Sequence, residues 1–179
     1  MFNNIVENTL NNMNKREIIN KVSDMLNIKK LLIDERDIGE NIKIKAFAQH
    51  NKGLIDINRY FIASTLNNYL LKLENDNMQD KFLKLFIESM LVHELHHVYL
   101  YKFQKELYEK FKHEDEDVLY SCKRIEIQAD EFMISYMEKY YQNKGKYVAQ
   151  FLKVLRDTPG GERKFNELDR LIEQYMNTN

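Results

Sequence analysis

The chain has 179 residues, 44% of them hydrophobic, which is enough for one domain with its own hydrophobic core. Its 27 basic and 28 acidic residues leave a net charge of −1, which argues against binding to nucleic acid or to an anionic membrane. The single cysteine, Cys122, excludes an intrachain disulfide and a zinc site built from several cysteines.

The start of the chain lacks the basic and apolar segments of a secretory signal, and no stretch approaches the ~18 apolar residues of a membrane span. We therefore expect a cytoplasmic protein. The frequent use of Lys, Ile and Asn points to an AT-rich genome, bacterial or phage.

The N-terminal part is predicted to be helical. Apolar residues recur on one side of residues 14–27, as in an amphipathic helix. They are Ile18, Ile19, Val22, Met25 and Leu26. We assign residues 1–41 to an N-terminal helical extension.

Two short strands are predicted next. Residues 42–48 read Ile-Lys-Ile-Lys-Ala-Phe-Ala, the alternation of a half-buried strand. Residues 50–53 supply a turn, in which His50 is most simply a turn residue, and residues 54–57 form a second strand. The pair is an expected β-hairpin.

Helices are predicted for the remainder, over residues 60–73, 80–110, 118–141, 146–156 and 162–176. A charged loop or helix start at residues 112–117, a break at 143–145 and a turn at 158–161 separate the last four. The sum is a single domain over residues 1–179, mostly α (α+β), with a small β-hairpin beside the helix of residues 80–110. Its core spans residues 42–140, and residues 145–179 form C-terminal helices.

The helix over residues 80–110 carries His93-Glu94-Leu95-His96-His97 at its centre. His93 and His97 are four residues apart, so one face of a helix holds both, and two imidazoles at that spacing can converge on one tetrahedral zinc ion. Glu94 lies beside them, within reach of a metal-bound water. The zinc lowers the pKa of this water and Glu94 takes its proton during attack, which makes Glu94 the expected general base.

The residues around this motif are apolar nearly all round the helix, which predicts that it is buried. Chance alone gives such a motif in about one per cent of chains of this composition. Buried polar groups without partners cost several kcal/mol, however, and a metal would supply the partner that three histidines and a glutamate need.

A second half of the site is predicted on the helix of residues 118–141. At about 100° per residue, Glu126 falls inside the apolar stripe of this helix and Asp130 falls at its edge. We expect Glu126 to be the third zinc ligand and Asp130 to accept the N–H of a ligand imidazole. The alternative is a salt bridge from these acids to a Lys or Arg of another helix.

Other metal sites need residues that the chain lacks. The metzincin motif needs Gly and His where Leu100 and Phe103 stand. A carboxylate-bridged di-iron bundle needs two Glu-x-x-His pairs, and only Glu94 and His97 form one. A nucleobase deaminase needs Pro-Cys-x-x-Cys.

The motif pair His93-Glu94-x-x-His97 and Glu126-x-x-x-Asp130, with 28 residues between His97 and Glu126, resembles the gluzincin metallopeptidases. The compact size and the hairpin before the active-site helix are similar to minigluzincins and to ImmA/IrrE-type metallopeptidases of bacteria and phages. The resemblance covers residues 42–140. It departs from the ImmA/IrrE type at Gln128, where that family often has Glu.

The resemblance implies that His93, His97 and Glu126 bind one zinc ion per chain, that Glu94 is the general base and that Asp130 supports a ligand. It also implies that the second strand is an edge that pairs with an extended peptide substrate. The residues of that strand are Leu54, Ile55, Asp56 and Ile57.

Three further residues are weaker candidates for stabilising the transition state. Tyr136 and Tyr140 continue the face that carries Glu126, although core packing is their simpler role. His113 lies in a charged run and is more simply solvated. For His96, the variable position of the motif, we expect a supporting or solvent-facing role rather than ligation.

The sequence thus predicts a zinc-dependent hydrolase that cleaves peptide bonds of a protein or peptide, more as an endopeptidase than as an exopeptidase. The alternative is a catalytically silent or latent protein of this fold that regulates a partner by binding it. An open fourth metal position favours the peptidase. A fourth ligand such as His96 or His113, or a C-terminal helix in the groove, favours the alternative.

Overall fold

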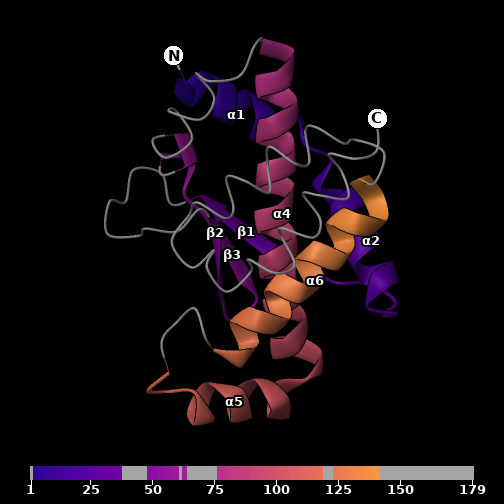
Figure 1. Ribbon diagram of the computed structural model, residues 1–179, viewed down its shortest axis with the longest axis vertical. Coiled ribbons are helices and arrows are strands. Elements are labelled where there is room, and N and C mark those ends of the chain that lie inside the picture. The colour runs from indigo at the N-terminus through magenta and orange to yellow at the C-terminus, as the bar shows by residue number, and fades with distance from the viewer. Residues whose placement is uncertain (1, 38–47, 61, 64–75, 119–122, 142–179) are drawn as a thin grey trace, which may run out of the picture.

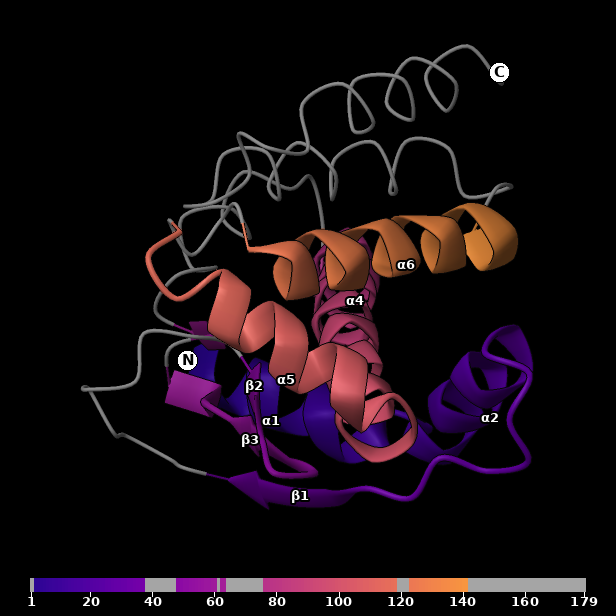
Figure 2. The same cartoon turned by 90° about the horizontal axis from the view of Figure 1, so that it is seen from below.

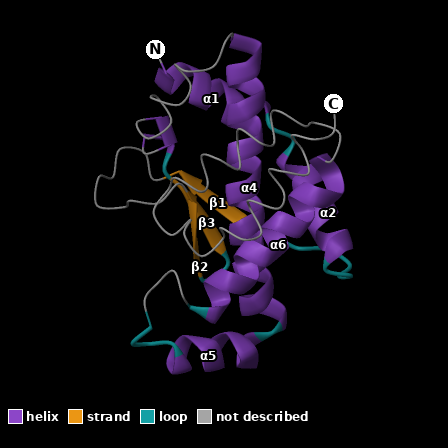
Figure 3. Cartoon of the chain, viewed as in Figure 1, coloured by secondary structure: helices purple, strands orange, loops and turns teal. Residues whose placement is uncertain are grey.

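The computed structural model describes residues 2–37, 48–60, 62–63, 76–118 and 123–141. The described elements confirm the prediction of a mostly α, α+β fold with a small sheet (Figure 3). In chain order they are α1 (Phe2–Asn12), α2 (Lys15–Met25), β1 (Asp34–Asp37), β2 (Ala48–Asn51), β3 (Leu54–Ile57), α4 (Asp76–Phe103), α5 (Lys105–Glu114) and α6 (Arg124–Tyr141).

Helix α4 is the centre of the fold and contacts α1, α2, α5, α6 and the sheet. It runs the length of the molecule in Figure 1, and the view along it in Figure 2 shows α6 and the sheet on different sides. Its apolar residues are buried nearly all round, as the sequence predicts. They include Leu83, Phe86, Leu91, Val92, Leu95 and Val98. No helix among the described residues is long and apolar enough to cross a membrane.

The sheet has the strand order β1-β3-β2, with β1 parallel and β2 antiparallel to β3. Lys52 (φ 50°) and Gly53 (φ 90°) form the turn between β2 and β3, with the positive φ angles that a two-residue hairpin turn requires. A Cβ at Gly53 would lie 2.9 Å from Cε of Lys102, so this turn is packed against the end of α4.

The prediction that β3 is an edge strand is wrong, because β1 and β2 pair with it on both sides. Ile55, Asp56 and Ile57 are buried, Leu54 is half-buried, and none has a free strand edge to offer a peptide. The Asp56 carboxylate accepts two hydrogen bonds of 2.7 Å from Arg36, its neighbour on β1. Strand β1 also corrects the prediction that residues 1–41 form a helical extension, because part of this segment is a strand. Its sequence, Asp-Glu-Arg-Asp, has no alternation of apolar and polar residues that would predict a strand.

The other strand prediction is corrected in its bounds. Strand β2 covers Ala48–Asn51, so His50 belongs to a strand and the turn is confined to Lys52 and Gly53. Residues 42–47, where the alternating pattern lies, fall outside the described residues.

The helix predictions hold in outline. Helix α2 matches residues 14–27, and α1 lies within the predicted helical extension of residues 1–41, although no separate bounds were predicted for it. Helix α4 begins before residue 80 and ends at Phe103, and α5 begins after Gln104, whose backbone leaves the helical region at φ −130° and ψ 43°. Helix α6 starts at Arg124, not at residue 118, and α5 includes part of the predicted loop of residues 112–117. The helices predicted after residue 141, and most of the one over 60–73, lie outside the described residues.

Candidate metal centre

Three side chains from α4 and α6 meet as a compact group of possible metal ligands, namely His93, His97 and Glu126. Nε2 of His93 lies 3.2 Å from Oε2 of Glu126 and 3.1 Å from Nε2 of His97. Nε2 of His97 lies 3.5 Å from Oε1 of Glu126. A tetrahedral zinc ion with bonds of about 2.0–2.1 Å separates its ligand atoms by about 3.3–3.4 Å. The three atoms therefore already have nearly the spacing of one face of such a tetrahedron.

The backbone explains this convergence. His93 and His97 are one turn apart on α4, and their rings meet edge to face with centroids 4.8 Å apart. Glu126 lies in the first turn of α6, which packs against α4. Since both helices are anchored in the hydrophobic core, the ligand atoms are held by packed elements and not by a loop.

Asp130, one turn after Glu126, lies on the other side of His93. Its Oδ1 is 2.9 Å from Nδ1 of His93, which is the contact predicted for it. Such a contact fixes the ring and leaves Nε2 facing the other two ligand atoms. Glu126 and Asp130 are both buried, in accord with the predicted register of the apolar stripe, whereas Glu131, the next residue, is exposed.

The charges of the group favour a cation at its centre. Burial alone lowers the pKa of His93, but hydrogen bonds with Asp130 and Glu126 outweigh it and raise the pKa to about 10. Burial alone raises the pKa of Glu126, but hydrogen bonds with His93 and His97 outweigh it and hold that pKa well below its usual range. Among the described residues, the ion pairs of Glu126 are with the imidazoles of His93 and His97, not with a Lys or Arg as in the alternative salt bridge.

Glu94 lies next to the three ligands and is only 8% exposed. Burial raises the pKa of its carboxyl, against the opposing effect of His93 and His97. The carboxylate also accepts a hydrogen bond from the backbone N–H of His50 in β2. Glu94 therefore lies between the ligands and the sheet, and its raised pKa suits a group that takes up a proton.

The structure adds an aromatic cluster that the sequence did not suggest, formed by His50 of β2, Tyr101 of α4 and Tyr108 of α5. The ring of His50 lies 5.3 Å from that of Tyr101 and 6.0 Å from that of Tyr108, and the two tyrosine rings are 5.6 Å apart. The same ring is 6.5 Å from His97, so the cluster borders the site. Burial lowers the pKa of His50 to about 4, so this ring is neutral at physiological pH, and its Nε2 accepts the N–H of Gly53.

Tyr108 is the tyrosine of the cluster whose phenol responds to the charges of the site. Burial raises the pKa of its phenol, and the charges of Glu126 and Glu94 raise it further, after that of the adjacent Glu109. The sequence missed this residue because the break at Gln104 involves neither Gly nor Pro. A continuous helix would carry Tyr108 away from the site, whereas the change of direction into α5 returns it.

Other predicted residues are not brought to the site. The hydroxyl of Tyr136 donates to Glu88 within the core, and Tyr140 packs on Tyr136. Tyr136 follows Glu126 by ten residues, or about 15 Å along a helix, so neither it nor Tyr140 reaches the ligands. His113 is exposed at the end of α5.

His96 is buried but faces elsewhere. Its ring stacks on Phe132 with centroids 5.0 Å apart, and burial, followed by the charges of His97 and His93, lowers its pKa to about 3. Neither His96 nor His113 belongs to the group of possible ligands, so among the described residues no fourth side chain joins His93, His97 and Glu126 there.

No family model matches the chain, and no curated protein or solved structure is significantly similar to it. The interpretation of the site therefore depends on its own geometry.

Proposed function

We propose that the chain is a zinc metallopeptidase with a gluzincin-type centre. The observation that carries this proposal is the convergence of His93, His97 and Glu126, with ligand atoms 3.1–3.5 Å apart, next to the buried carboxylate of Glu94. A structural ion pair would account for His93, His97 and Glu126 alone, but it gives no role to a fourth buried residue, Glu94, whose pKa is raised.

The donor set fits zinc. Two imidazole nitrogens and one carboxylate oxygen, with the fourth position left open, are the ligands of a catalytic zinc ion rather than of a closed structural one. Calcium and magnesium prefer oxygen donors alone. A bound zinc ion would supply Lewis acidity, which makes a water molecule acidic near neutral pH and polarises a peptide carbonyl.

Each neighbouring residue then has a chemical role. The carboxylate of Glu94 accepts the proton of the attacking water and donates it to the departing amine nitrogen. Asp130 holds the N–H of His93 at Nδ1, which keeps Nε2 free for the metal. The hydroxyl of Tyr108 donates a hydrogen bond to the carbonyl oxygen as negative charge develops there.

The substrate would be an extended peptide added to β2 rather than to β3. Among the described residues β2 pairs on one side only, with β3. The N–H of His50 is directed to Glu94, so the unpaired side of β2 faces the site. Backbone hydrogen bonds to this strand would place a scissile carbonyl beside Glu94, with affinity from main-chain contacts.

The alternative is a latent or silent metal protein that binds a partner. One contact favours it, because Glu94 already occupies the N–H of His50 that a peptide carbonyl would use. A zinc-loaded protein that binds unstructured peptides without cleaving them would support this alternative.

The test is elemental analysis of the untagged full chain, followed by assay on an unfolded protein substrate. We expect about one zinc per chain and cleavage at internal peptide bonds. Less than about a tenth of an equivalent after gentle purification, with no uptake on dialysis against zinc, would refute the proposal. We expect His97→Ala to lose the metal. Glu131→Gln, at an exposed position on α6, is the control and should retain it.

A further inference from the structure

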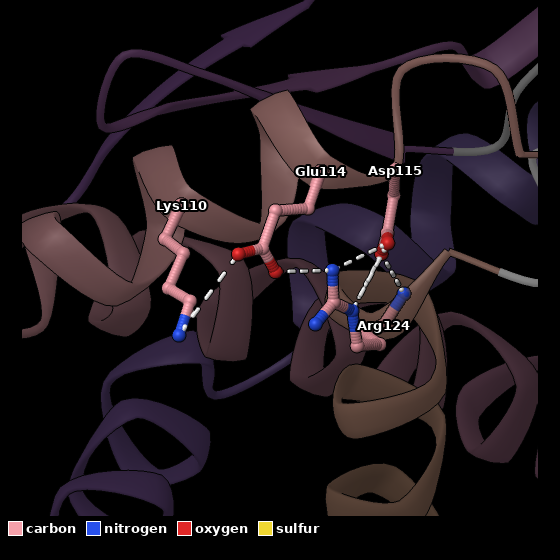
Figure 4. Close-up of polar contacts among 4 residues, drawn as sticks. All are labelled: Lys110, Glu114, Asp115 and Arg124. Carbon is pink, nitrogen blue, oxygen red and sulfur yellow. Dashed lines mark hydrogen bonds and ion pairs between the residues drawn. The ribbon is translucent and has the colours of Figure 1, made fainter.

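The corner between α5 and α6 is closed by an ion pair that the proposed chemistry does not use. Asp115 directly follows α5, and Arg124 is the first residue of α6. Asp115 is only 6% exposed, although it is a carboxylate at the end of a surface helix. Figure 4 shows the two side chains facing each other, with Glu114 beside them.

The contacts of this pair are numerous and short. Oδ2 of Asp115 accepts a hydrogen bond of 2.7 Å from the backbone N–H of Arg124. Oδ1 accepts hydrogen bonds from Nη2 of Arg124 at 2.7 Å and from Nε at 3.0 Å. Glu114 also binds Nη2, at 2.7 Å. The guanidinium lies over the ring of Phe111, 4.5 Å from its centre. The arginine is thus held by three side chains at the end of α5 or directly after it.

The pair also completes the start of α6. The first N–H groups of a helix have no partner within it, and Asp115 supplies one for Arg124 from outside the helix. A carboxylate there also compensates the positive end of the helix. Hydrogen bonds from the Arg124 side chain and backbone lower the pKa of Asp115, so the carboxylate stays ionised.

The position of α6 matters because its first turn contains Glu126, two residues after Arg124. The oxygens of Glu126 lie 3.2 and 3.5 Å from the two imidazoles, and a metal site tolerates errors of only about 0.5 Å. Helix α5 has no buried residue of its own, so packing alone fixes this corner weakly.

We infer that Asp115 and Arg124 are positioning residues, which set the first turn of α6 so that Glu126 meets His93 and His97. The inference depends on the proposed function only in taking this meeting point to be a metal site. By fixing the end of α5 to the start of α6, the pair also sets Tyr108 relative to Glu126.

The experiment uses the full chain with Asp115→Asn and the milder Arg124→Lys, which keeps the charge but loses the two-pronged contact. The control is Lys110→Gln on the exposed side of α5, where Nζ of Lys110 lies 4.0 Å from Oε1 of Glu114. Zinc affinity is measured by chelator competition, the absorption spectrum by cobalt substitution, and the melting temperature on metal-free protein.

We expect Asp115→Asn and Arg124→Lys to weaken zinc binding about tenfold or more and to change the cobalt spectrum. Lys110→Gln should leave both unchanged. Variants that melt lower but keep wild-type zinc affinity and cobalt spectrum would overturn the inference, because the pair would then be only structural.

A second measurement does not depend on metal. In crystals of the metal-free protein, Asp115→Asn or Arg124→Lys should displace the Glu126 carboxylate from His97 relative to wild type. An unmoved carboxylate overturns the inference. If the wild type binds no zinc but the carboxylate moves, the proposed function fails while the positioning role stands.

Discussion

His93 and Asp130 lie on different helices, yet Nδ1 of the imidazole is 2.9 Å from Oδ1 of the carboxylate. This contact orients the ring so that its other nitrogen faces Glu126 at 3.2 Å. Two carboxylates thus hold one imidazole from both sides, one as a candidate ligand and the other as its support.

The three acids of α6 should therefore differ in a defined order. Glu126→Ala removes a ligand and should abolish measurable zinc binding at micromolar protein. Asp130→Ala should weaken zinc binding by about 10–100-fold, as the loss of a supporting contact does. Glu131→Ala should change nothing, because that side chain is exposed. Zinc titration of the three variants gives the order, and a larger loss from Glu131→Ala than from Glu126→Ala would contradict the assignment.

Glu94→Gln should separate metal binding from chemistry. The amide keeps the size of the side chain but cannot accept a proton, so we expect full zinc content and a loss of hydrolysis of about 10²–10⁴-fold. Both quantities are measured on one preparation. Retained activity would show that another group is the base, and lost zinc would show that Glu94 also contributes to binding.

Tyr108→Phe tests the hydroxyl that the sequence did not reveal. If it stabilises negative charge on the carbonyl oxygen, kcat should fall about 10²-fold while KM and zinc content stay near wild type. Tyr101→Phe is the matched control, because its ring belongs to the same aromatic cluster. Equal losses in both variants would indicate that the cluster acts through packing and that Tyr108 has no catalytic role.

The motif on α4 and the acids on α6 were predictable because each depends on helical periodicity alone. His93 and His97 share a face at a spacing of four, and Glu126 stands where an apolar residue is expected. The histidines of α4 and the acids of α6 meet because the apolar residues of both helices pack into one core.

Features that depend on contacts between distant residues were not predictable. Strand β1 has no apolar alternation and exists through pairing with β3 and through Arg36 and Asp56. The turn at Gln104 has no Gly or Pro, and it decides where Tyr108 lies. The assignment of the substrate edge to β3 failed for the same reason, because its second neighbour came from an unexpected part of the chain.

The pKa of His93 predicts how zinc affinity depends on pH. In metal-free protein the pKa of His93 is raised to about 10, so at neutral pH the imidazole carries a proton that zinc must displace. Zinc binding should release about one proton per ion near pH 7.5, and affinity should rise as pH increases. Calorimetry in buffers of different ionisation enthalpy measures this release.

The raised pKa of His93 also makes the stability of the metal-free protein depend on pH. A raised pKa in the folded state means that His93 contributes stability fully below its unfolded pKa of about 6.5, and that this contribution is lost as pH rises towards about 10. Glu126, whose pKa is lowered, contributes above about pH 4.5 and loses its contribution as pH falls. His93 and Glu126 together should therefore stabilise the metal-free protein most between about pH 4.5 and 6.5 and less at pH 9.

The variant Asp130→Asn tests this dependence. It removes a hydrogen bond that raises the pKa of His93, so the free energy of unfolding, measured in urea, should fall less between pH 6.5 and pH 9 than in the wild type. An unchanged pH profile in that variant would show that Asp130 does not hold the proton on His93.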